Sequence, residues 1–333
     1  MWQLYKRISI FVIPILLFLV LVILIDPMGL IPRVQLLPVI GFAARPVKTM
    51  NYLESNLDYD MLILGSSRTM RMDSQITDSL GYKTYNFAMF NTRMEDQYCI
   101  LKLVLDKNRT KLKKVILGID PEMFHNNRDV DWRLYSVPVL SDYLYEWQRR
   151  PISDFTGKIV QINVRNTIWS VLFYIQGKSK AKEKGFIAEN GNIFDTPLQP
   201  QNVAVEKMDH NKSEYLKMMS NFTDLDSTRL KYLDDFLDLC YENEIDVALY
   251  LTPVHPEMYL HLDKNSEYGR MHQKLAEYLS GKDYPNLLYR DYSVPELFEG
   301  RNEDFTDLSH MASVNCYLVM QKLLHVEFGL GLE

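Results

Sequence analysis

Serine, histidine and aspartate, the residue types of a nucleophilic acyl-transfer site, occur at two widely separated places in the chain. Ser66 and Ser67 lie early in the sequence, and Asp307 and His310 stand three residues apart near its end. A serine hydroxyl is a weak nucleophile that needs a base within reach, and a histidine can accept and return its proton near neutral pH. An aspartate beside the histidine fixes the tautomer of the ring. The two places together indicate a Ser-His-Asp site.

The residues before the serine pair predict a buried strand that runs into a turn. Met61–Leu64 is apolar without alternation, as expected for a strand covered on both faces. Gly65 permits a sharp turn and a close backbone approach. Open α/β sheets bind their ligands at the carboxyl ends of such strands. The alternative is that the serines only cap a following helix.

Four further residues are candidates for oxyanion or substrate binding. Asn91, Asp120 and His255 each follow a predicted strand, and Arg68 stands next to the serines. Because the carboxyl ends of parallel strands share one edge of a sheet, these residues are expected to meet the Ser-His-Asp residues there. Arg68 is expected to pair with a carboxylate or, alternatively, to bind substrate.

Two of these candidates also have simpler explanations. Asp120 precedes Pro121 and can be a turn former. His255 lies between two prolines on a rigid loop, where a surface histidine is the common case. A metal site formed by these two residues with Asp307 and His310 is conceivable, but no HExxH-like spacing supports it. The sequence therefore predicts no metal and no cofactor.

Strands and helices alternate on both sides of a long interruption, which predicts an α/β fold with a parallel sheet. Apolar runs indicate the strands, and helical periodicity with capping and stop signals indicates the helices. The expected strands are residues 59–64, 83–88, 114–119, 244–251 and 286–289. The expected helices are residues 74–80, 93–105, 226–241, 266–279 and 311–326.

The alternation stops over residues 125–222, which we assign to a mainly helical insertion. This stretch is rich in tryptophan and tyrosine and carries a basic run, Lys178–Lys184. One interpretation is a lid, or a contact surface for a polymer or a membrane. The other is a helical insertion with a small core of its own and a solvated basic loop.

The composition excludes some classes of protein. The chain has 333 residues, 47% of them hydrophobic, and a formal net charge of -6. It is therefore expected to fold as a globular protein and not to be a general nucleic-acid binder. Cys99, Cys240 and Cys316 form neither a CxxC pair nor a zinc spacing, and at most one disulfide could form among them. Cys99 and Cys240 lie on expected amphipathic helices, so these two are expected to be buried free thiols.

The amino terminus predicts a membrane anchor. Residues 8–25 are apolar except for one serine and one proline, and a helix of this length approaches the roughly 30 Å of a bilayer core. A lysine and an arginine precede this run, which places the amino terminus in the cytoplasm. No small-x-small cleavage site follows closely, so the anchor is expected to stay uncleaved. The predicted parts are a cytoplasmic tail (1–7), the anchor (8–25), a membrane-proximal connector (26–58) and an extracytoplasmic domain (59–333).

The serine block and the histidine block together resemble a known family. Gly65-Ser66-Ser67 after a buried strand, with Asp307-x-x-His310 before the last helix, resembles the SGNH/GDSL hydrolase superfamily. The Gly-Ser-Ser variant is similar to membrane-anchored envelope acyltransferases of the D-alanyl transfer and alginate O-acetylation type. The resemblance covers about residues 59–327 outside the insertion. It implies a flavodoxin-like, three-layer SGNH fold, with Ser67 as nucleophile, His310 as base and Asp307 as its orienting acid.

Two other blocks of that family are altered here. Asn86–Asn91 resembles the second block, but Asn91 replaces a glycine. Asparagine tolerates positive φ better than most residues, and its amide could donate to an oxyanion beside the backbone N–H of Ser67. In the third block Asp120 replaces an asparagine, and an ionised carboxylate cannot donate a hydrogen bond. These departures leave a degenerate site as an alternative.

The resemblance implies serine-dependent acyl transfer or ester hydrolysis, of O-acetyl or D-alanyl type, on a cell-envelope polymer. The enzyme would work on the outer face of a bacterial cytoplasmic membrane. A transferase would need an outside acyl donor or a multispanning O-acyltransferase partner. The rival hypotheses are a non-catalytic envelope binding or assembly protein that kept the fold, and a simple extracytoplasmic esterase or lipase.

Overall fold

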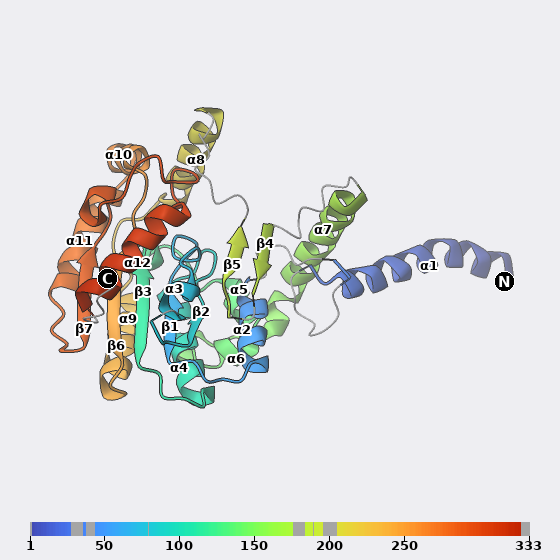
Figure 1. The fold of residues 1–333 in the computed structure, drawn as a ribbon. Helices are drawn as coiled ribbons and strands as arrows, with labels where there is room; N and C mark the ends of the chain where they lie inside the picture. Colours follow the sequence, from blue (N-terminus) through green and yellow to red (C-terminus); the bar gives the residue numbers. More distant parts are fainter. Residues whose placement is uncertain are drawn as a thin grey trace.

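Five parallel strands form the central sheet of the protein (Figure 1). Their order in space is β2-β1-β3-β6-β7, so the chain winds outward from β1 in both directions. Every neighbouring pair in this sheet is parallel, which confirms the α/β fold expected from the alternation. The strands are β1 (Met61–Leu64), β2 (Thr84–Asn86), β3 (Lys114–Ile119), β6 (Asp246–Leu251) and β7 (Leu287–Asp291).

The computed structural model describes residues 2–27, 36–37, 44–78, 80–175, 184–188, 190–195 and 205–327. Within these residues the α-helices are α1 (Trp2–Ile25), α2 (Ala44–Glu54), α3 (Ser74–Asp78), α4 (Met94–Lys107), α5 (Trp132–Tyr135), α6 (Pro138–Ser141), α7 (Thr156–Ile175), α8 (Val205–Met218), α9 (Ser227–Glu242), α10 (Pro256–Asn265), α11 (Tyr268–Ser280) and α12 (Ser313–Glu327). Short 3-10 helices are η2 (Pro121–Phe124), η3 (Glu146–Gln148), η4 (Ile152–Phe155) and η6 (Pro295–Phe298).

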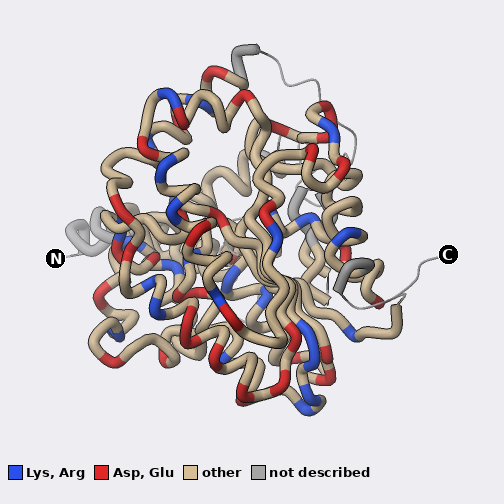
Figure 2. Tube along the Cα trace, turned by 90° about the vertical axis from the view of Figure 1, so that its left-hand side faces the viewer, with Lys and Arg blue, Asp and Glu red and all other residues tan. Residues whose placement is uncertain are grey.

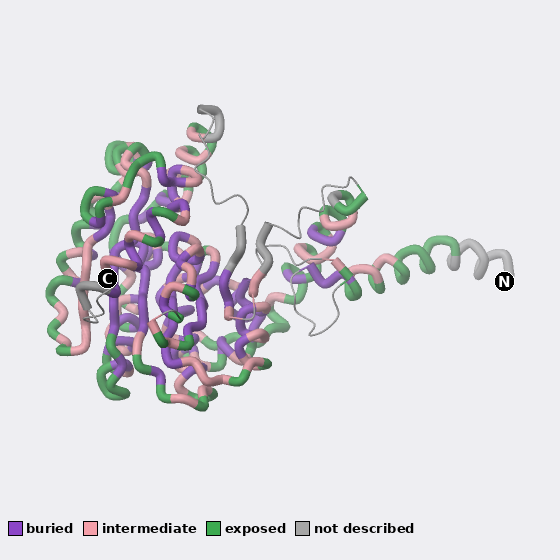
Figure 3. The backbone as a smooth tube through the Cα atoms, in the orientation of Figure 1, coloured by how far each residue is buried: buried purple, intermediate pink, exposed green. Residues whose placement is uncertain are grey.

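Helices cover both faces of the sheet, because alternate residues of each strand point to opposite sides. Leu62 and Leu64 of β1 lie in the larger core with side chains of α4, α9 and α11. Met61 and Ile63 lie in a smaller core with side chains of α12. Burial on both faces explains why β1 is apolar at every position. Figure 3 shows the buried part of the trace concentrated in the sheet.

The register of the strands brings their carboxyl ends to one edge. Leu64 at the end of β1 pairs with Leu117 of β3, and Ile119 at the end of β3 pairs with Leu251 at the end of β6. The segments that follow these strands therefore start from neighbouring positions. They are the segments that carry the predicted site residues, so the site lies at this edge.

Part of the predicted connector belongs to the core. The sequence predicts a connector over residues 26–58, but residues 44–54 form α2, and its Tyr52 is fully buried in the larger core. Lys48 of α2 is buried too, and its ammonium group donates to the carbonyl oxygen of Ala88 at 2.6 Å. A helix that buries charged residues has no simple hydrophobic stripe, which is why its pattern was not recognised.

The insertion between β3 and β6 is mainly helical, as predicted. It carries α5, α6, α7 and α8, and also an antiparallel pair that was not expected, β4 (Lys184–Ile187) with β5 (Ile193–Asp195). Helix α8 packs against α10, which follows β6 (Figure 1). Of the predicted basic run, residues 178–183 lie outside the described residues. Acidic and basic residues are interspersed along the described trace (Figure 2).

The amino-terminal helix α1 extends away from the sheet (Figure 1). Its side chains are described from Ile10 onward, and most of them up to Leu24 are exposed and apolar. Within the described residues, no helix is long and apolar enough to cross a membrane. The predicted anchor, residues 8–25, begins outside the residues whose side chains are described.

Candidate active site

Ser67, His310 and Asp307 are joined by hydrogen bonds at the carboxyl edge of the sheet. Nε2 of His310 lies 2.8 Å from Oγ of Ser67. Nδ1 of the same ring lies 2.8 Å from Oδ2 of Asp307. With the Nδ1 proton donated to Asp307, Nε2 can accept the proton of the serine hydroxyl. The His310 side chain is 23% exposed, so the site opens to solvent.

Asp307 is held by several donors from its own loop. Its Oδ1 accepts from the backbone N–H of Ser309 at 2.7 Å, the Ser309 hydroxyl at 2.8 Å and the backbone N–H of His310 at 2.9 Å. Burial alone would raise the pKa of Asp307, but His310 and these Ser309 donors hold the pKa well below its ordinary value. Asp307 therefore stays ionised at neutral pH and orients the imidazole. Ser309 was not among the predicted site residues.

The loop that carries Asp307 and His310 is closed on itself and tied to a neighbouring strand end. Phe305 and Met311 form an isolated antiparallel bridge across its base. The backbone N–H of Thr306 donates to the carbonyl oxygen of His310 at 2.9 Å. The N–H of His255, after β6, donates to the carbonyl oxygen of Leu308 at 3.1 Å. These bonds fix the imidazole without help from a regular element.

Gly65 makes the turn that presents Ser67, as the sequence predicts. Its φ is 144°, a backbone conformation open to glycine, and a Cβ at this position would lie 2.5 Å from Oγ1 of Thr69 and 2.8 Å from the carbonyl oxygen of Gly118. The hydroxyl of Ser66 accepts from the backbone N–H of Arg68 at 3.1 Å. Ser66 therefore has the local capping role expected for one of the two serines, and Ser67 has the bond to His310.

Neither a protein-family model nor a curated protein matches the chain. The SGNH/GDSL resemblance stays a prediction that rests on the serine block and on Asp307-x-x-His310. In the structure these two blocks lie side by side, because Ser67 and His310 are hydrogen-bonded to each other.

Arg68 and Asp120 lie in a buried ion-pair cluster beneath the nucleophile. Nη2 of Arg68 lies 2.6 Å from the carboxylate of Glu122, and Nη1 lies 3.5 Å from that of Asp120. Burial would lower the pKa of Arg68, but Glu122 and Asp120 raise it well above its ordinary value. Asp120 also accepts a hydrogen bond from the Thr252 hydroxyl. In this arrangement Asp120 serves as an acceptor, and Arg68 has the carboxylate partner that the sequence predicts.

Tyr215 of the insertion covers this cluster and was not predicted as a site residue. The guanidinium carbon of Arg68 lies 5.9 Å from the centre of the Tyr215 ring. Burial, together with the charges of Glu122 and Asp307, raises the pKa of the Tyr215 hydroxyl to about 12. Aromatic residues occur throughout the insertion, so no sequence pattern distinguished this one. The insertion therefore contributes to the surroundings of both Arg68 and the Asp307 loop.

Asn91 stands in the turn that packs over Gly65. Its φ is 50°, a positive φ that asparagine tolerates better than most residues. The backbone N–H of Met89 and the Thr92 hydroxyl both donate to the carbonyl oxygen of Gly65, at 3.1 and 3.0 Å. Among the described residues, the structure gives neither the Asn91 side-chain amide nor the Ser67 backbone N–H a hydrogen-bond partner. Both therefore keep a hydrogen-bond donor that no described residue engages.

His255 has a structural role in this arrangement. Its Nδ1 accepts from the backbone N–H of Glu257 at 3.2 Å and caps α10. Its ring contacts Phe305 edge-on, with ring centres 5.5 Å apart. Burial lowers the pKa of His255, which favours the neutral form that this cap needs. His255 thus caps α10 and packs against the neighbouring loop, and it is half-buried, unlike the surface histidine of the simpler explanation.

The described residues contain no cluster of three or more side chains placed to bind a metal ion. Cys99, Cys240 and Cys316 are all buried free thiols, which confirms the prediction for Cys99 and Cys240. Burial raises the pKa of each thiol, so none of the three is an activated nucleophile. Ser67 is consequently the residue on which a nucleophilic mechanism can be built.

Proposed function

We propose that the protein is a serine-dependent acyltransferase or esterase that uses Ser67, His310 and Asp307. The observation that carries this proposal is the hydrogen-bond chain from Ser67 Oγ through the His310 ring to Asp307. Those bonds run between groups of the types and in the order that nucleophilic catalysis by serine requires. The position at the carboxyl edge of a parallel sheet supports the same proposal.

In the first half of the reaction, Oγ of Ser67 attacks the carbonyl carbon of an acyl ester while its proton passes to Nε2 of His310. The backbone N–H of Ser67 and the amide of Asn91 stabilise the oxyanion of the tetrahedral intermediate. As the intermediate collapses, the C–O bond to the leaving alcohol breaks and His310 returns the proton to that alcohol. The product is an acyl group bound to Ser67 through an ester.

In the second half, His310 takes a proton from the incoming hydroxyl, which attacks the acyl-enzyme. The bond to Ser67 Oγ breaks, and the proton returns from His310 to Ser67. Water as the incoming group makes the protein an esterase, and a hydroxyl of a polymer makes it a transferase. Exclusion of water from the site decides between the two.

The fold and the likeness to the SGNH/GDSL superfamily support this reading together. The strand order β2-β1-β3-β6-β7 is the flavodoxin-like order 2-1-3-4-5, with the crossover point between β1 and β3. Ser67 follows β1 and Asp120 follows β3, on either side of that point. By the resemblance, the acyl group is O-acetyl or D-alanyl and the acceptor is a cell-envelope polymer.

For the location, we propose that residues 8–25 anchor the protein in a bacterial cytoplasmic membrane with the amino terminus inside. The support is the apolar sequence of this run and the exposed apolar side chains along α1. The catalytic domain then lies outside the cytoplasm. A transferase in this position takes its acyl group from an external donor or from a multispanning O-acyltransferase partner.

One observation favours a second candidate, a non-catalytic envelope assembly protein. Asp120, which replaces the amide donor of the related family, is bound to Arg68 and to the Thr252 hydroxyl. An oxyanion site without that donor is weaker than a complete one. The bond between Ser67 and His310 speaks for catalysis, because a protein that only binds has no need of it.

Labelling with a fluorophosphonate tests the proposal on the full-length protein in detergent. We expect peptide mass spectrometry to find the label on Ser67, and both Ser67→Ala and His310→Ala to lose it. Ser66→Ala is the matched control, because Ser66 caps the turn and does not touch His310, and it should keep the label. A folded protein that takes no label would overturn catalysis by Ser67 and favour the assembly protein.

A further inference from the structure

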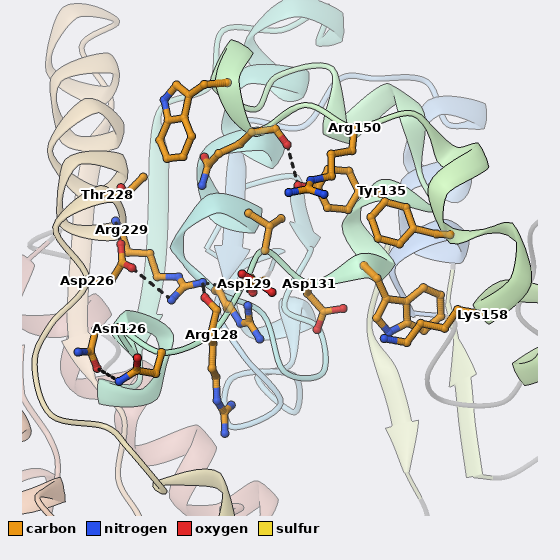
Figure 4. A pocket seen from close by; sticks show the side chains of 17 residues that line it. Asn126, Arg128, Asp129, Asp131, Tyr135, Arg150, Lys158, Asp226, Thr228 and Arg229 are labelled. Carbon is orange, nitrogen blue, oxygen red and sulfur yellow. Dashed lines mark hydrogen bonds and ion pairs between the residues drawn. The ribbon is translucent and has the colours of Figure 1, made fainter.

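A large cavity lies between the insertion and the start of α4 (Figure 4). Its volume is about 990 Å³, which is ample for an organic ligand of several rings. Neither Ser67, Asp307 nor His310 lines it. The groups that decide its chemistry are Arg93, Arg128, Arg229, Trp132, Phe155 and Lys158.

Five basic side chains and three carboxylates line the cavity wall. Nε and Nη1 of Arg93 are buried and have no hydrogen-bond partner among the described residues. Burial, followed by the charge of Arg229, lowers the pKa of Arg93. Burial also lowers the pKa of Arg128, while the charge of Glu122 raises it and that of Arg229 lowers it. A buried guanidinium with unbonded N–H groups favours an anion as its partner.

The carboxylates nearest to Arg93 are already engaged by other arginines. Glu95, Asp96 and Asp131 attract Arg93 electrostatically, but none of them is hydrogen-bonded to its guanidinium; Asp96 accepts only from the Arg93 backbone N–H, at 2.9 Å. Their partners are Arg229 for Glu95 at 3.0 Å, Arg45 for Asp96 at 2.7 Å and Arg133 for Asp131 at 2.9 Å. An incoming anion would therefore not compete with a pre-formed salt bridge of Arg93.

The other two acidic residues of the wall do not change this balance. Asp226 is the cap of α9 and accepts from the backbone N–H of Arg229 at 3.0 Å, and its carboxylate lies 3.9 Å from the Arg229 guanidinium. Asp129 is exposed to solvent. Figure 4 shows both beside the guanidinium groups of Arg128 and Arg229. Of the three lining carboxylates, Asp131 and Asp226 are thus engaged by arginine groups, and Asp129 lies in solvent.

Aromatic rings form the opposite part of the wall. Tyr135 and Phe155 stack with ring centres 4.7 Å apart and planes 9° from parallel. Nζ of Lys158 lies 5.4 Å from the centre of the Trp132 ring. Flat aromatic faces bind the apolar face of a ring, while guanidinium and ammonium groups bind its anionic substituents. The two halves of the cavity therefore suit a ligand that combines a ring with a negative charge.

We propose that this cavity binds an anionic glycan, with a carboxylate or phosphate on Arg93 and Arg128 and a sugar ring on Trp132 and Phe155. The inference does not depend on catalysis by Ser67, because binding here uses none of the residues of that site. Since the protein as a whole carries a net charge of -6, a polyanion is drawn to this local positive wall and not to the surface in general.

Isothermal titration of the full-length protein in detergent tests the proposal with defined probes. Tetragalacturonate carries carboxylates, glucose 6-phosphate carries a phosphate, and maltotetraose is the neutral match. We expect one or both anionic sugars to bind, and Arg93→Gln and Arg128→Gln each to weaken that binding about tenfold or more. The matched control is Arg301→Gln, an exposed arginine far from the cavity wall in sequence, which should bind as the wild type does.

Three results would overturn the inference in distinguishable ways. Equal affinity of the anionic sugars for the wild type and both arginine variants, or no binding at all, would remove the anion site. Equal affinity of maltotetraose would show that charge plays no part. If inorganic phosphate binds as tightly as glucose 6-phosphate, and Phe155→Leu does not weaken the binding of glucose 6-phosphate, the sugar ring contributes nothing and the ligand is not a glycan. Fluorophosphonate labelling of Arg93→Gln should match the wild type, which separates this test from that of the proposed function.

Discussion

The guanidinium of Arg68 lies 3.5 Å from the carboxylate of Asp120, and this contact joins the turn after β1 to the end of β3. Arg68 directly follows the nucleophile, and both side chains are almost fully buried. The ion pair therefore fixes the turn of Ser67 against the neighbouring strand. It also gives the aspartate at position 120 a structural role of its own.

Replacing Arg68 should destabilise the protein strongly. Arg68→Met leaves Asp120 and Glu122 as buried carboxylates without their cation, and breaking a buried ion pair in this way costs about 3 kcal/mol or more. Urea unfolding should show a lower midpoint with an unchanged slope. Arg301→Met, at an exposed position, is the control and should change the midpoint little. A midpoint for Arg68→Met equal to that of the wild type would contradict a structural role for the cluster.

Asp307 should contribute stability at neutral pH that disappears in acid. Its pKa in the folded protein is below the ordinary value near 4, so the folded state holds the proton less tightly than the unfolded chain. The contribution is complete above the unfolded pKa and is lost as the pH falls through the folded pKa. The difference in unfolding free energy between wild type and Asp307→Asn should thus shrink from pH 7 toward pH 2. A difference that stays constant over this range would refute the assignment.

The same substitution should slow the chemistry far more than it alters the fold. Asp307→Asn removes the acceptor that fixes the Nδ1 proton of His310, so the imidazole can present the wrong tautomer to Ser67. We expect the rate of fluorophosphonate labelling to fall on the order of 10²–10⁴-fold. Circular dichroism at neutral pH should remain that of the wild type. Labelling at the wild-type rate would mean that Asp307 does not act through His310.

The sheet and the approach of Ser67 to His310 and Asp307 could be predicted from the sequence. Buried parallel strands are continuous apolar runs, and their carboxyl ends must share an edge, so Ser67 and His310 could be placed together from topology alone. The loop around His310 is then fixed by local bonds of Ser309, which a spacing does not reveal. Tyr215 belongs to the insertion and contacts Arg68. The insertion lacks the alternation of strands and helices, so the sequence does not predict where its residues lie relative to the sheet.

Helix α2, in contrast, could not be predicted from its sequence pattern. Its buried positions include Arg45 and Lys48, which a hydrophobicity pattern treats as solvent-facing. Arg45 is satisfied by Asp96 at 2.7 Å and Lys48 by backbone carbonyl oxygens, partners that lie about 40 to 50 residues away in the chain. Such long-range pairing can be seen only once the fold is known.

Gly65→Ala should destabilise the turn of the nucleophile. A Cβ there would lie 2.8 Å from the backbone oxygen of Gly118, which cannot move without shifting β3, and the positive φ adds strain. We expect a loss of about 2 kcal/mol in unfolding free energy and slower labelling of Ser67. Gly157→Ala is the matched control, because a Cβ at Gly157 meets nothing within 4 Å and a helical alanine is favourable. Equal stabilities of the two variants would contradict the close approach.

Lys48 should make the protein more stable as the pH rises above neutral. Burial holds the pKa of its ammonium well below the ordinary value near 10.4, so the unfolded chain binds this proton more tightly than the folded protein does. Stability then rises with pH between the folded and the unfolded pKa. Unfolding free energies at pH 7 and pH 9.5 should therefore differ less for Lys48→Met than for the wild type. An identical pH dependence would show that Lys48 titrates normally.

Asn91 should contribute to catalysis through its side chain and not through its backbone conformation. Glycine accepts the φ of 50° without strain, whereas alanine at this φ costs about 1 kcal/mol. If the Asn91 amide binds the oxyanion, Asn91→Gly and Asn91→Ala should both lower the labelling rate about 10²-fold, because both remove the donor. Only Asn91→Ala should lower the midpoint of unfolding.

The pair of variants separates the two roles that the sequence left open at this position. Should Asn91→Gly label as fast as the wild type while Asn91→Ala is slow, the residue acts only by holding positive φ, as a glycine would. The oxyanion would then be stabilised by the backbone N–H of Ser67 without the Asn91 amide. Loss of rate in both variants, with the stability of Asn91→Gly intact, makes the amide a functional replacement for the donor that Asp120 cannot supply while it accepts from the Thr252 hydroxyl.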